Sequence, residues 1–547
     1  MLRGIKLVFF VGLLVGIVFG LMAQSTSAED QVLRIAVATT DISDLHPHIG
    51  VAKGDRGIIH TMFNGLVRYK PGDMAAPFEP DLAESWEASP DKKGWTFHLR
   101  RGVMVHPWDD HPAYELTSED VVYSFQSAAD PAQSAFAAEY AGMTFEAVDR
   151  YTVKISLDQP LSEVLMLPKV ADYAGGLIMS KKAAEDLGKD YHTRPVGTGP
   201  FMFKEYKPKE KYVVVRNEDY FRGVPKLAGV EFRFMPDESS RKFGLQSQEL
   251  DAIVGATQPF VKEMEAVPGV IVDTYGPGHV IMLYINMTKE PFDDIRVRRA
   301  VLYSLNRDEA RATVGLDLTE KVYVLVPPLV SGGLTREELE ERGRQDGKDY
   351  VYETDRNKAK ELLTEAGFPN GFSTEMYITE REDYQVYMPN IQFQLRKSGI
   401  DLKLRTVEHS TYHSYIRKDM NPIVAYNAWR PDANVFLTHF YYSDSIVVTG
   451  ASPNINFSHI GGVDADGDGT INSVDNLIEA ARRELDPGKQ ADFWKKAQIK
   501  ARDWAVSWPG FLKKFVIARN SYLDWGYDLK SSIQGFPIID ELTTISK

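Results

Sequence analysis

The pattern of apolar and polar residues along the chain predicts a mixture of strands and helices. Residues 32–39, VLRIAVAT, form an apolar, β-branched run that is typical of a buried strand. Residues 95–100 and 151–157 alternate apolar with polar side chains, which predicts strands with one exposed face. Between them, residues 116–128 begin with Thr and Ser followed by acidic residues, which predicts a capped helix.

The rest of the chain continues this alternation. Residues 229–235 predict a further strand, and residues 293–311 form a strongly amphipathic stretch that predicts one helix. Residues 356–372 predict a helix that ends with Gly367 as its left-handed cap, because a proline follows and prevents continuation. Alternating units of this kind favour an α/β fold with partly parallel sheets. A chain of 547 residues has enough apolar material for two or three domains.

The N-terminus predicts export from the cytoplasm. Arg3 and Lys6 precede an uncharged apolar run over residues 7–23, which the small polar stretch 24–28 follows. We expect a secretory signal at residues 1–28, cleaved after Ala28, and a periplasmic mature protein. An uncleaved membrane anchor is the alternative, because the apolar run is almost long enough to span a bilayer.

Composition excludes several classes of function. The formal net charge is −14 and acidic groups are scattered along the chain, so we expect no binding to nucleic acid. The chain has no cysteine, which excludes disulfides, zinc-thiolate sites, iron–sulfur clusters and thiol nucleophiles. It also has no HExxH, GxSxG or phosphate-loop motif, so we expect that the protein is not an enzyme.

An ordered set of short stretches carries a family resemblance. The chain resembles the extracytoplasmic solute-binding proteins of ABC importers, in the class that binds peptides, nickel and opines. Each stretch is a weak signal alone, but the ordered set is specific and extends over nearly the whole chain. The stretches are residues 78–89, 95–106, 116–125, 195–206, 216–237, 291–309 and 358–371.

The resemblance implies a two-lobe periplasmic-binding-protein fold of type II, in its large form with three subdomains. The lobes would be joined by a hinge that the chain crosses twice, with a central ligand cleft that closes on the ligand. Lobe I would consist of residues 29–275 and 510–547, with an inserted subdomain at about 75–195, and lobe II of residues 276–509. The crossings would lie near residues 275–285 and 509–516.

The resemblance also implies a function. The protein would capture a short peptide between its lobes and deliver it to the permease and ATPase subunits of an ABC transporter, acting as a monomer. A nickel chelate, an opine or another anionic solute are alternative ligands. A calcium-dependent extracellular interaction module is the alternative from another functional class.

The stretch 427–440, NAWRPDANVFLTHF, is the candidate ligand wall in lobe II. Trp429 matches the tryptophan that packs on the ligand in peptide binders, where a large flat ring needs little ordering. Asp432 aligns either with the aspartate that binds the ligand's amine or with a later, structural aspartate. In the second case Arg430 brings positive charge to the site and favours an anionic ligand, unless Arg430 is a solvated surface residue.

Further candidates lie near the expected lobe boundary. His46 and His48 flank a proline in the loop after the first strand, where ligands sit in folds of this type. They would bind a metal chelate or a carboxylate, or have ordinary loop partners. Tyr275 and His279 lie at the first expected crossing and are further ligand candidates.

The strongest local motif is DADGDGTINSVD, residues 464–475, which has the donor spacing of an EF-hand calcium loop. A helical pattern follows directly, and no entering helix is evident, so the loop resembles half of a dockerin repeat. We expect a structural calcium ion; the alternative is an acidic turn that binds nothing. The candidate ligands are Asp464, Asp466, Asp468, Thr470, Asn472 and Asp475.

Overall fold

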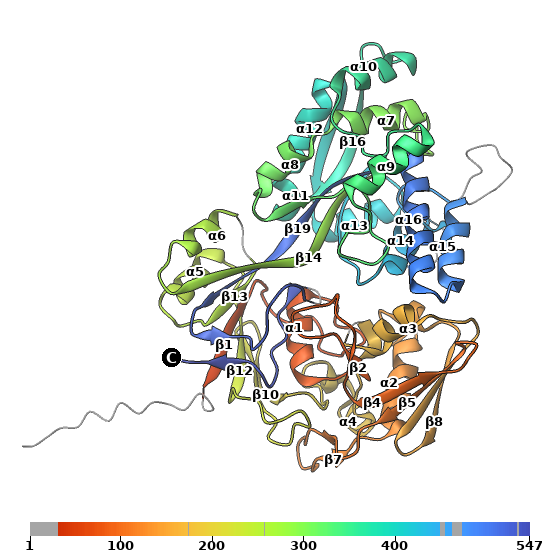
Figure 1. Cartoon of the computed structure of the whole chain (residues 1–547). Coiled ribbons are helices and arrows are strands. Elements are labelled where there is room, and N and C mark those ends of the chain that lie inside the picture. The colour runs from red at the N-terminus through yellow and green to blue at the C-terminus, as the bar shows by residue number, and fades with distance from the viewer. Residues whose placement is uncertain (1–30, 173, 256–257, 449–454, 462–472, 533–534) are drawn as a thin grey trace, which may run out of the picture.

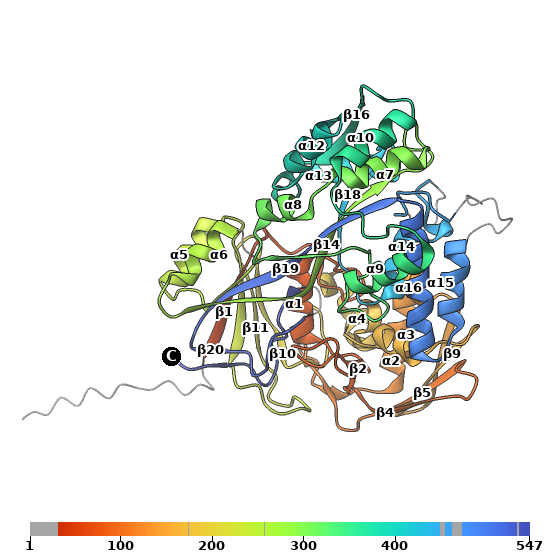
Figure 2. The same cartoon turned by 45° about the horizontal axis from the view of Figure 1, so that its top comes forward.

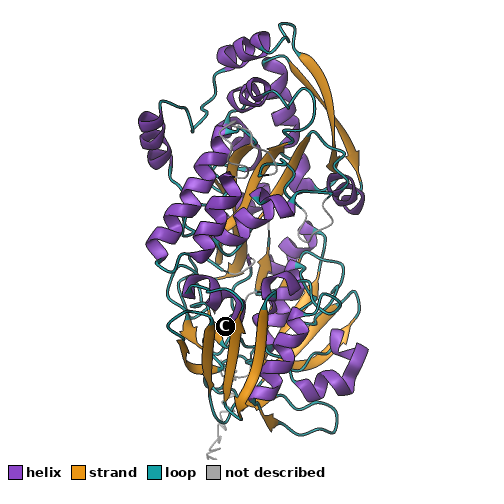
Figure 3. Cartoon of the chain, turned by 90° about the vertical axis from the view of Figure 1, so that its right-hand side faces the viewer, coloured by secondary structure: helices purple, strands orange, loops and turns teal. Residues whose placement is uncertain are grey.

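The computed structural model describes residues 31–547, apart from residues 173, 256–257, 449–454, 462–472 and 533–534. The chain forms two lobes that a pair of long strands connects (Figure 1). Figure 3 shows helices flanking the strands in both lobes. Within the described part of the chain, no helix is both long and apolar enough to cross a bilayer.

A sheet of nine strands extends through both lobes in the order β10-β11-β12-β1-β13-β19-β14-β18. The predicted first strand is β1 (Val32–Val37), which lies parallel to both β12 (Gly229–Phe234) and β13 (Ala252–Val254). This arrangement confirms the predicted α/β class with partly parallel sheets. The other strands are β10 (Phe201–Lys207), β11 (Lys211–Arg216), β14 (Val270–Ile285), β18 (Ile423–Ala428), β19 (Ser507–Asn520) and β15 (Thr319–Lys321), which pairs with β19.

The strands β14 and β19 cross between the lobes as one antiparallel ribbon (Figures 1 and 2). Their pairing begins at Val270 with Asn520 and ends at Tyr284 with Ser507. Tyr275 belongs to the apolar core of lobe I, whereas Ile281 belongs to a core of lobe II. The ribbon therefore passes from one core to the other between these residues, within the range where the crossings are expected.

The register of the ribbon shifts between Tyr275 and His279. Gly278 lies at this irregularity, and a Cβ atom there would be 1.7 Å from the carbonyl oxygen of Lys513. Only glycine allows the two backbones to approach so closely. The irregular point thus coincides with the passage between the lobes.

Lobe I contains the inserted subdomain, an antiparallel sheet in the order β4-β5-β9-β8 with helices beside it. The predicted alternating strands are β5 (Gly94–Leu99) and β9 (Thr152–Leu157), and the predicted capped helix is α2 (Ser118–Ala129). Thr117 and Asp120 form a capping box at the start of α2. The remaining elements of this lobe are α1 (Lys53–Met62), β4 (Ala83–Ala88), η2 (Ala137–Tyr140), β8 (Met143–Asp149), α3 (Glu163–Val170), α4 (Lys181–Leu187), α5 (Glu238–Gln246) and α6 (Gln258–Glu265).

Lobe II contains a parallel pair of strands and most of the long helices. The predicted single helix at 293–311 is wrong, because the structure has α7 (Ile295–Ser304) and α8 (Arg307–Val314) there. Asn306 separates them by accepting a hydrogen bond from the backbone N–H of Glu309, as an N-cap does. The predicted left-handed cap Gly367 has φ of 94° and follows α10 (Arg356–Glu365).

The other elements of lobe II are α9 (Arg336–Asp346), β16 (Phe372–Thr379), α11 (Glu382–Gln385), α12 (Met388–Lys397), β17 (Ile400–Val407), α13 (His409–Arg417), α14 (Ala433–Tyr441), α15 (Ser473–Arg483) and α16 (Pro487–Asp503). Short two-stranded pairs complete the chain: β2 (Val67–Arg68) with β3 (Glu79–Pro80), β6 (Met104–Val105) with β7 (Tyr114–Glu115), and β20 (Leu523–Asp524) with β21 (Thr544–Ile545).

The close approach at Gly278 gives a stability prediction. We expect Gly278→Ala to lower the free energy of unfolding by about 1–3 kcal/mol, because the added methyl group collides with backbone. Gly276→Ala is the matched control, since a Cβ there would meet only Leu329 Cδ1 and Gly278 N, at 3.7 and 3.8 Å. Denaturant unfolding of both variants measures the difference, and equal stabilities would contradict the prediction.

Candidate ligand-binding site

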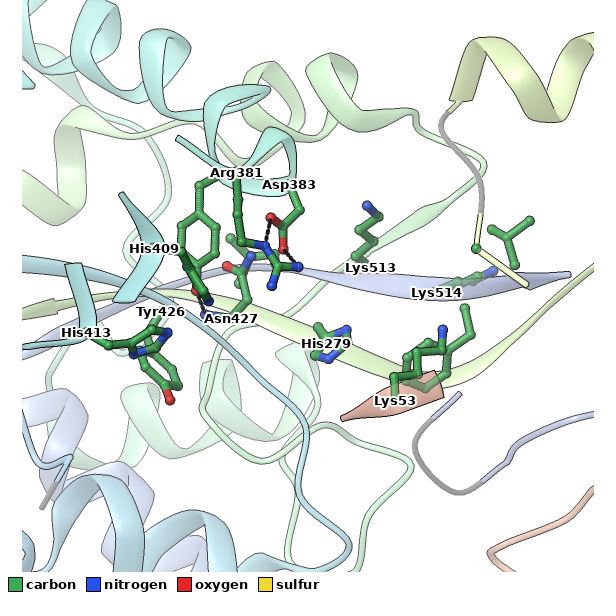
Figure 4. A pocket seen from close by; sticks show the side chains of 15 residues that line it. Lys53, His279, Arg381, Asp383, His409, His413, Tyr426, Asn427, Lys513 and Lys514 are labelled. Atoms are coloured by element: carbon green, nitrogen blue, oxygen red, sulfur yellow. Dashed lines mark hydrogen bonds and ion pairs between the residues drawn. The ribbon is translucent and has the colours of Figure 1, made fainter. Parts of the chain in front are cut away.

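A cavity of about 390 Å³ lies beside the crossing ribbon and receives residues from both lobes (Figure 4). Lobe I contributes Lys53 and Gly255, the ribbon contributes side chains of β14 and β19, and lobe II contributes the rest. The lining residues are Lys53, Gly255, His279, Ile281, Arg381, Asp383, Tyr384, His409, His413, Tyr426, Asn427, Lys513, Lys514, Phe515 and Val516.

Two lysines of this lining have no acidic partner in the described part of the chain. Lys53, the first residue of α1, has its Nζ 4.8 Å from the centre of the Phe515 ring. Burial, with a contribution from Lys513, lowers the pKa of Lys53 to about 8. Burial also lowers the pKa of Lys513. Lys514 differs, because it forms an ion pair with Glu320 at 2.8 Å.

Arg381 and Asp383 enter the cavity from the N-terminal end of α11. Arg381 Nε donates a hydrogen bond to Asp383 Oδ1 at 3.0 Å, the pair drawn in Figure 4. Asp383 is the one carboxylate among the described lining residues. The lining therefore has more positive than negative charge.

The neutral polar part of the lining is held by hydrogen bonds within lobe II. Asn427, on β18, accepts a hydrogen bond from Tyr387 Oη at 2.9 Å through its side chain. Its backbone N–H donates to Tyr384 Oη at 3.2 Å. These bonds fix Asn427 beside the cavity before any ligand arrives.

Three histidines face the cavity, and burial keeps their pKa values low. His409 and His413 are one turn apart on α13, with ring centres 4.5 Å apart. Burial lowers the pKa of His413 to about 4 and that of His279 to about 3. They are therefore neutral near pH 7 and can donate or accept hydrogen bonds.

The structure places only one of the predicted ligand residues, His279, in the lining of this cavity. Tyr275 is buried in lobe I, where its ring contacts that of Phe515 at a tilt of 46°, and it donates a hydrogen bond from Oη to the carbonyl of Gly535 at 3.1 Å. It therefore supports the ribbon beneath the cavity.

The predicted segment around Trp429 lies at the lobe boundary. Trp429 belongs to lobe II by sequence but packs with the apolar core of lobe I. Arg430 Nε donates to His439 Nδ1 at 3.0 Å, so the guanidinium is held by protein groups. Asp432 accepts a hydrogen bond from the backbone N–H of Val435 at 2.9 Å and is the N-cap of α14. Burial raises the pKa of Asp432 to about 6.

His46 and His48 lie inside lobe I, away from the lining of this cavity. The ring centre of His46 is 5.4 Å from that of His48 and 5.3 Å from that of His192. His48 has ordinary partners, the hydroxyl of Ser127 and the carbonyl of Leu177. Throughout the described residues, no group of three or more His, Cys, Asp or Glu side chains is arranged to hold a metal ion.

Sequence reasoning missed Lys53, Arg381 and Lys513. A signal for Lys513 was present, because two adjacent lysines interrupt the apolar strand WPGFLKKFVIA at the expected second crossing. Lys53 is the first residue of α1, and Arg381 directly precedes α11. Neither has a distinctive local sequence pattern, so only the folded structure brings them together.

Most of the calcium-type loop lies outside the described residues: Asp464, Asp466, Asp468, Thr470 and Asn472. Asp475 is described, in the first turn of α15. Its carboxylate accepts hydrogen bonds from the backbone N–H of Ser443 at 3.1 and 3.3 Å. Burial raises the pKa of Asp475 to about 6.

Comparison with known proteins identifies the family. Residues 77–446 match the model of the bacterial extracellular solute-binding proteins, family 5 Middle. The chain belongs to this family. Its members are binding proteins, and the predicted resemblance is confirmed.

A solved structure supports the fold. The solute-binding protein MoaA of A. tumefaciens R10, in complex with mannopinic acid, is 35% identical to this chain. The TM-score is 0.79, and the match covers 95% of this chain and all of MoaA. The predicted large periplasmic-binding-protein fold is therefore confirmed.

Two curated relatives are similar in sequence. The dipeptide-binding protein of Escherichia coli K12 is 29% identical over 475 residues, which is 81% of this chain and 82% of the relative. Heme-binding protein A of Haemophilus influenzae Rd is 30% identical over 338 residues, which is 58% of each chain.

The low pKa of Lys53 gives a pH prediction. Folding holds this pKa at about 8, below its ordinary value, so the charged form destabilises the folded protein near neutral pH. We expect the wild type to gain on the order of 1–2 kcal/mol between pH 8 and pH 10 relative to Lys53→Met, allowing for partial exposure. Denaturant unfolding across this range measures it.

Lys514→Met is the control for this prediction, because Lys514 has a carboxylate partner. The difference in free energy of unfolding between the wild type and Lys514→Met should not rise between pH 8 and pH 10 as it does for Lys53→Met. Parallel pH profiles for the wild type and Lys53→Met would contradict the assignment.

Proposed function

We propose that this protein captures a small anionic solute between its two lobes and delivers it to the permease and ATPase subunits of an ABC importer. It acts in the periplasm as a monomer after removal of residues 1–28. An acidic short peptide, an opine or a similar carboxylate fits the site. Family membership supports the transport role, and the charge of the cavity supports the ligand class.

The observation that carries the ligand class is the excess of cations in the cavity lining. Lys53 and Lys513 are partly buried without an acidic partner among the described residues, and Arg381 shares the single carboxylate of Asp383. Burying such charges is costly unless an opposite charge meets them. A ligand carboxylate would form charge-assisted hydrogen bonds with these groups and offset that cost.

The same lining explains how a peptide would fit. The C-terminal carboxylate of a peptide would bind the cations, and Asp383 would take the amine. Asp432 is engaged as the cap of α14, so it is not the amine partner in this arrangement. A peptide with an acidic side chain satisfies more of the cationic groups than a neutral or basic one.

The comparisons are compatible with this ligand class. MoaA was solved with mannopinic acid, and the Escherichia coli relative is a dipeptide-binding protein. Both kinds of ligand are small, and both fit a closing cleft whose cations provide the anchor.

A ligand panel tests the proposal. We expect mannopinic acid or Glu-Glu to raise the melting temperature of the wild type, and Lys-Lys to leave it unchanged, because only anions offset the charge of the cavity. Arg381→Met should weaken binding of the anionic probe by about 10- to 100-fold, the loss of one charge-assisted contact. Calorimetric titration measures the affinities.

Arg405→Met is the matched control, because Arg405 is an exposed arginine of lobe II that pairs with Glu375 at 2.8 Å. Mass spectrometry of the solute that co-purifies with the protein gives an independent answer. Selective stabilisation by Lys-Lys, or recovery of a cationic solute, would overturn the anionic ligand class.

We also propose that residues 464–475 bind one calcium ion in a structural role. The spacing of the oxygen donors supports this, and Asp475 at the twelfth position is buried at the start of α15. A bound cation would offset the repulsion between the clustered carboxylates.

Removal of calcium tests this second proposal. We expect EGTA to lower the melting temperature of the wild type by several degrees and to leave Asp464→Asn/Asp466→Asn unchanged, because that variant has already lost the ion. Asp492→Asn, on α16, is the control and should respond as the wild type does. If calcium instead promotes association with another protein, the interaction-module alternative is favoured.

A further inference from the structure

The inserted subdomain of lobe I meets lobe II at a place that is separate from the lining of the 390 Å³ cavity. Helix α3 lies near α14, α15 and α16 (Figures 1 and 2). Residues of η2 and α3 line one pocket together with residues of α14 and α15. Because α3 belongs to one lobe and α14–α16 to the other, contacts here depend on how the lobes are placed. They can therefore favour the closed arrangement.

Leu165 of α3 is the buried apolar residue of this contact, and Leu161 and Val164 beside it pack against the same core. Leu165 is buried and belongs to an apolar core whose other buried members, apart from Leu512 of β19, come from lobe II and include Phe436 and Phe440 of α14. A side chain from one lobe thus completes the core of the other, and separating the lobes would expose it to water.

A buried hydrogen bond crosses the same boundary. Ser162 Oγ donates to Gln490 Oε1 at 3.1 Å, and both residues are buried. Gln490 Nε2 donates to the carbonyls of Ala481 and Glu484 at 2.8 and 3.1 Å, which fixes the orientation of the amide. The amide oxygen of Gln490 therefore points to lobe I and finds its partner there.

A charged network crosses the same boundary between the lobes. Glu139 and Lys169 of lobe I form an ion pair at 2.5 Å, and Glu139 Oε1 is 4.0 Å from His439 Nε2 of lobe II. Arg430 donates to His439 Nδ1, so the proton of the neutral ring is on Nε2 and faces Glu139. The acid of lobe I is thus connected through His439 to Arg430, next to Trp429.

We propose that this contact is a closure latch, formed by Glu139, Ser162, Leu165 and Lys169 of lobe I with His439 and Gln490 of lobe II. It stabilises the closed receptor and lengthens ligand residence without lining the ligand cavity. The ligand-affinity part of this inference rests on the proposed function, whereas the effect on lobe closure does not. The affinity of a closing receptor scales with the population of its closed form, so the latch sets affinity from outside the site.

The absence of cysteine makes a direct test straightforward. Cysteines introduced at Glu119 on α2 and Lys360 on α10, both exposed and on opposite lobes, accept spin labels at unique positions. Distance distributions between the labels then report the open and closed fractions of the empty protein. The same measurement with saturating mannopinic acid gives the closed reference.

We expect Ser162→Ala to increase the open-to-closed ratio of the empty protein by about three- to tenfold, the usual effect of one lost hydrogen bond with a buried partner. Dissociation of mannopinic acid should accelerate by a similar factor, with little change in the association rate. Glu139→Gln should also raise the open-to-closed ratio and the dissociation rate, because it removes the negative charge that faces His439.

Ser124→Ala is the matched control. Ser124 is buried in the same subdomain, and its hydroxyl bonds only the backbone of Asp120 and Met179 within lobe I. This variant should lower stability and leave the open-to-closed ratio unchanged. If Ser162→Ala and Glu139→Gln both behave like Ser124→Ala, the latch is refuted. If mannopinic acid does not bind at all, the ligand class fails while the distances in the empty protein still decide the latch.

Discussion

The antiparallel pairing of β14 with β19 is the interaction on which the rest of the structure depends. These strands belong to the sheets of both lobes at once, so each lobe is built outward from the same hydrogen-bonded ribbon. The backbone hydrogen bonds of this ribbon continue from one lobe into the other, so a single ladder holds the lobes together. The cavity forms beside this ribbon because residues of both lobes meet there, and the ribbon itself provides His279, Lys513 and Lys514.

Charge is the second constraint. Lys53 comes from the start of a lobe I helix and Lys513 from the ribbon, and neither forms an ion pair with a carboxylate among the described residues. Burial lowers the pKa of Lys513 although Asp383 and Glu382 lie near enough to oppose that shift. A folded protein tolerates such an arrangement when it serves a function, because stability is sacrificed at sites that must bind. The histidines of the lining are neutral near pH 7, so they add no further positive charge beside these lysines.

Local pattern was sufficient to predict much of the fold. Strand β1, the alternating strands β5 and β9, the capped helix α2 and the cap at Gly367 all follow from short-range chemistry. The pattern failed at residues 293–311, where Asn306 interrupts a continuous amphipathic stretch by capping a new helix. For the site, proximity to the crossing identified His279, whereas Lys53 and Arg381 depend on tertiary contacts that join distant segments. Asp432 shows the converse, since one aspartate after a tryptophan fits a ligand contact and a helix cap equally well by sequence.

The segment from β18 through α14 links the two ends of the cleft by a short, continuous piece of chain. Tyr426 and Asn427 border the cavity, and about three helical turns' worth of sequence later, in α14, the same segment provides His439 for the contact with the inserted subdomain. The proposed ligand site and the proposed latch thus take residues from one short, continuous segment of chain. Substitutions near Asn427 can then change ligand specificity while the contact at His439 is kept. Related proteins can therefore differ in the solutes they bind and still close in the same way.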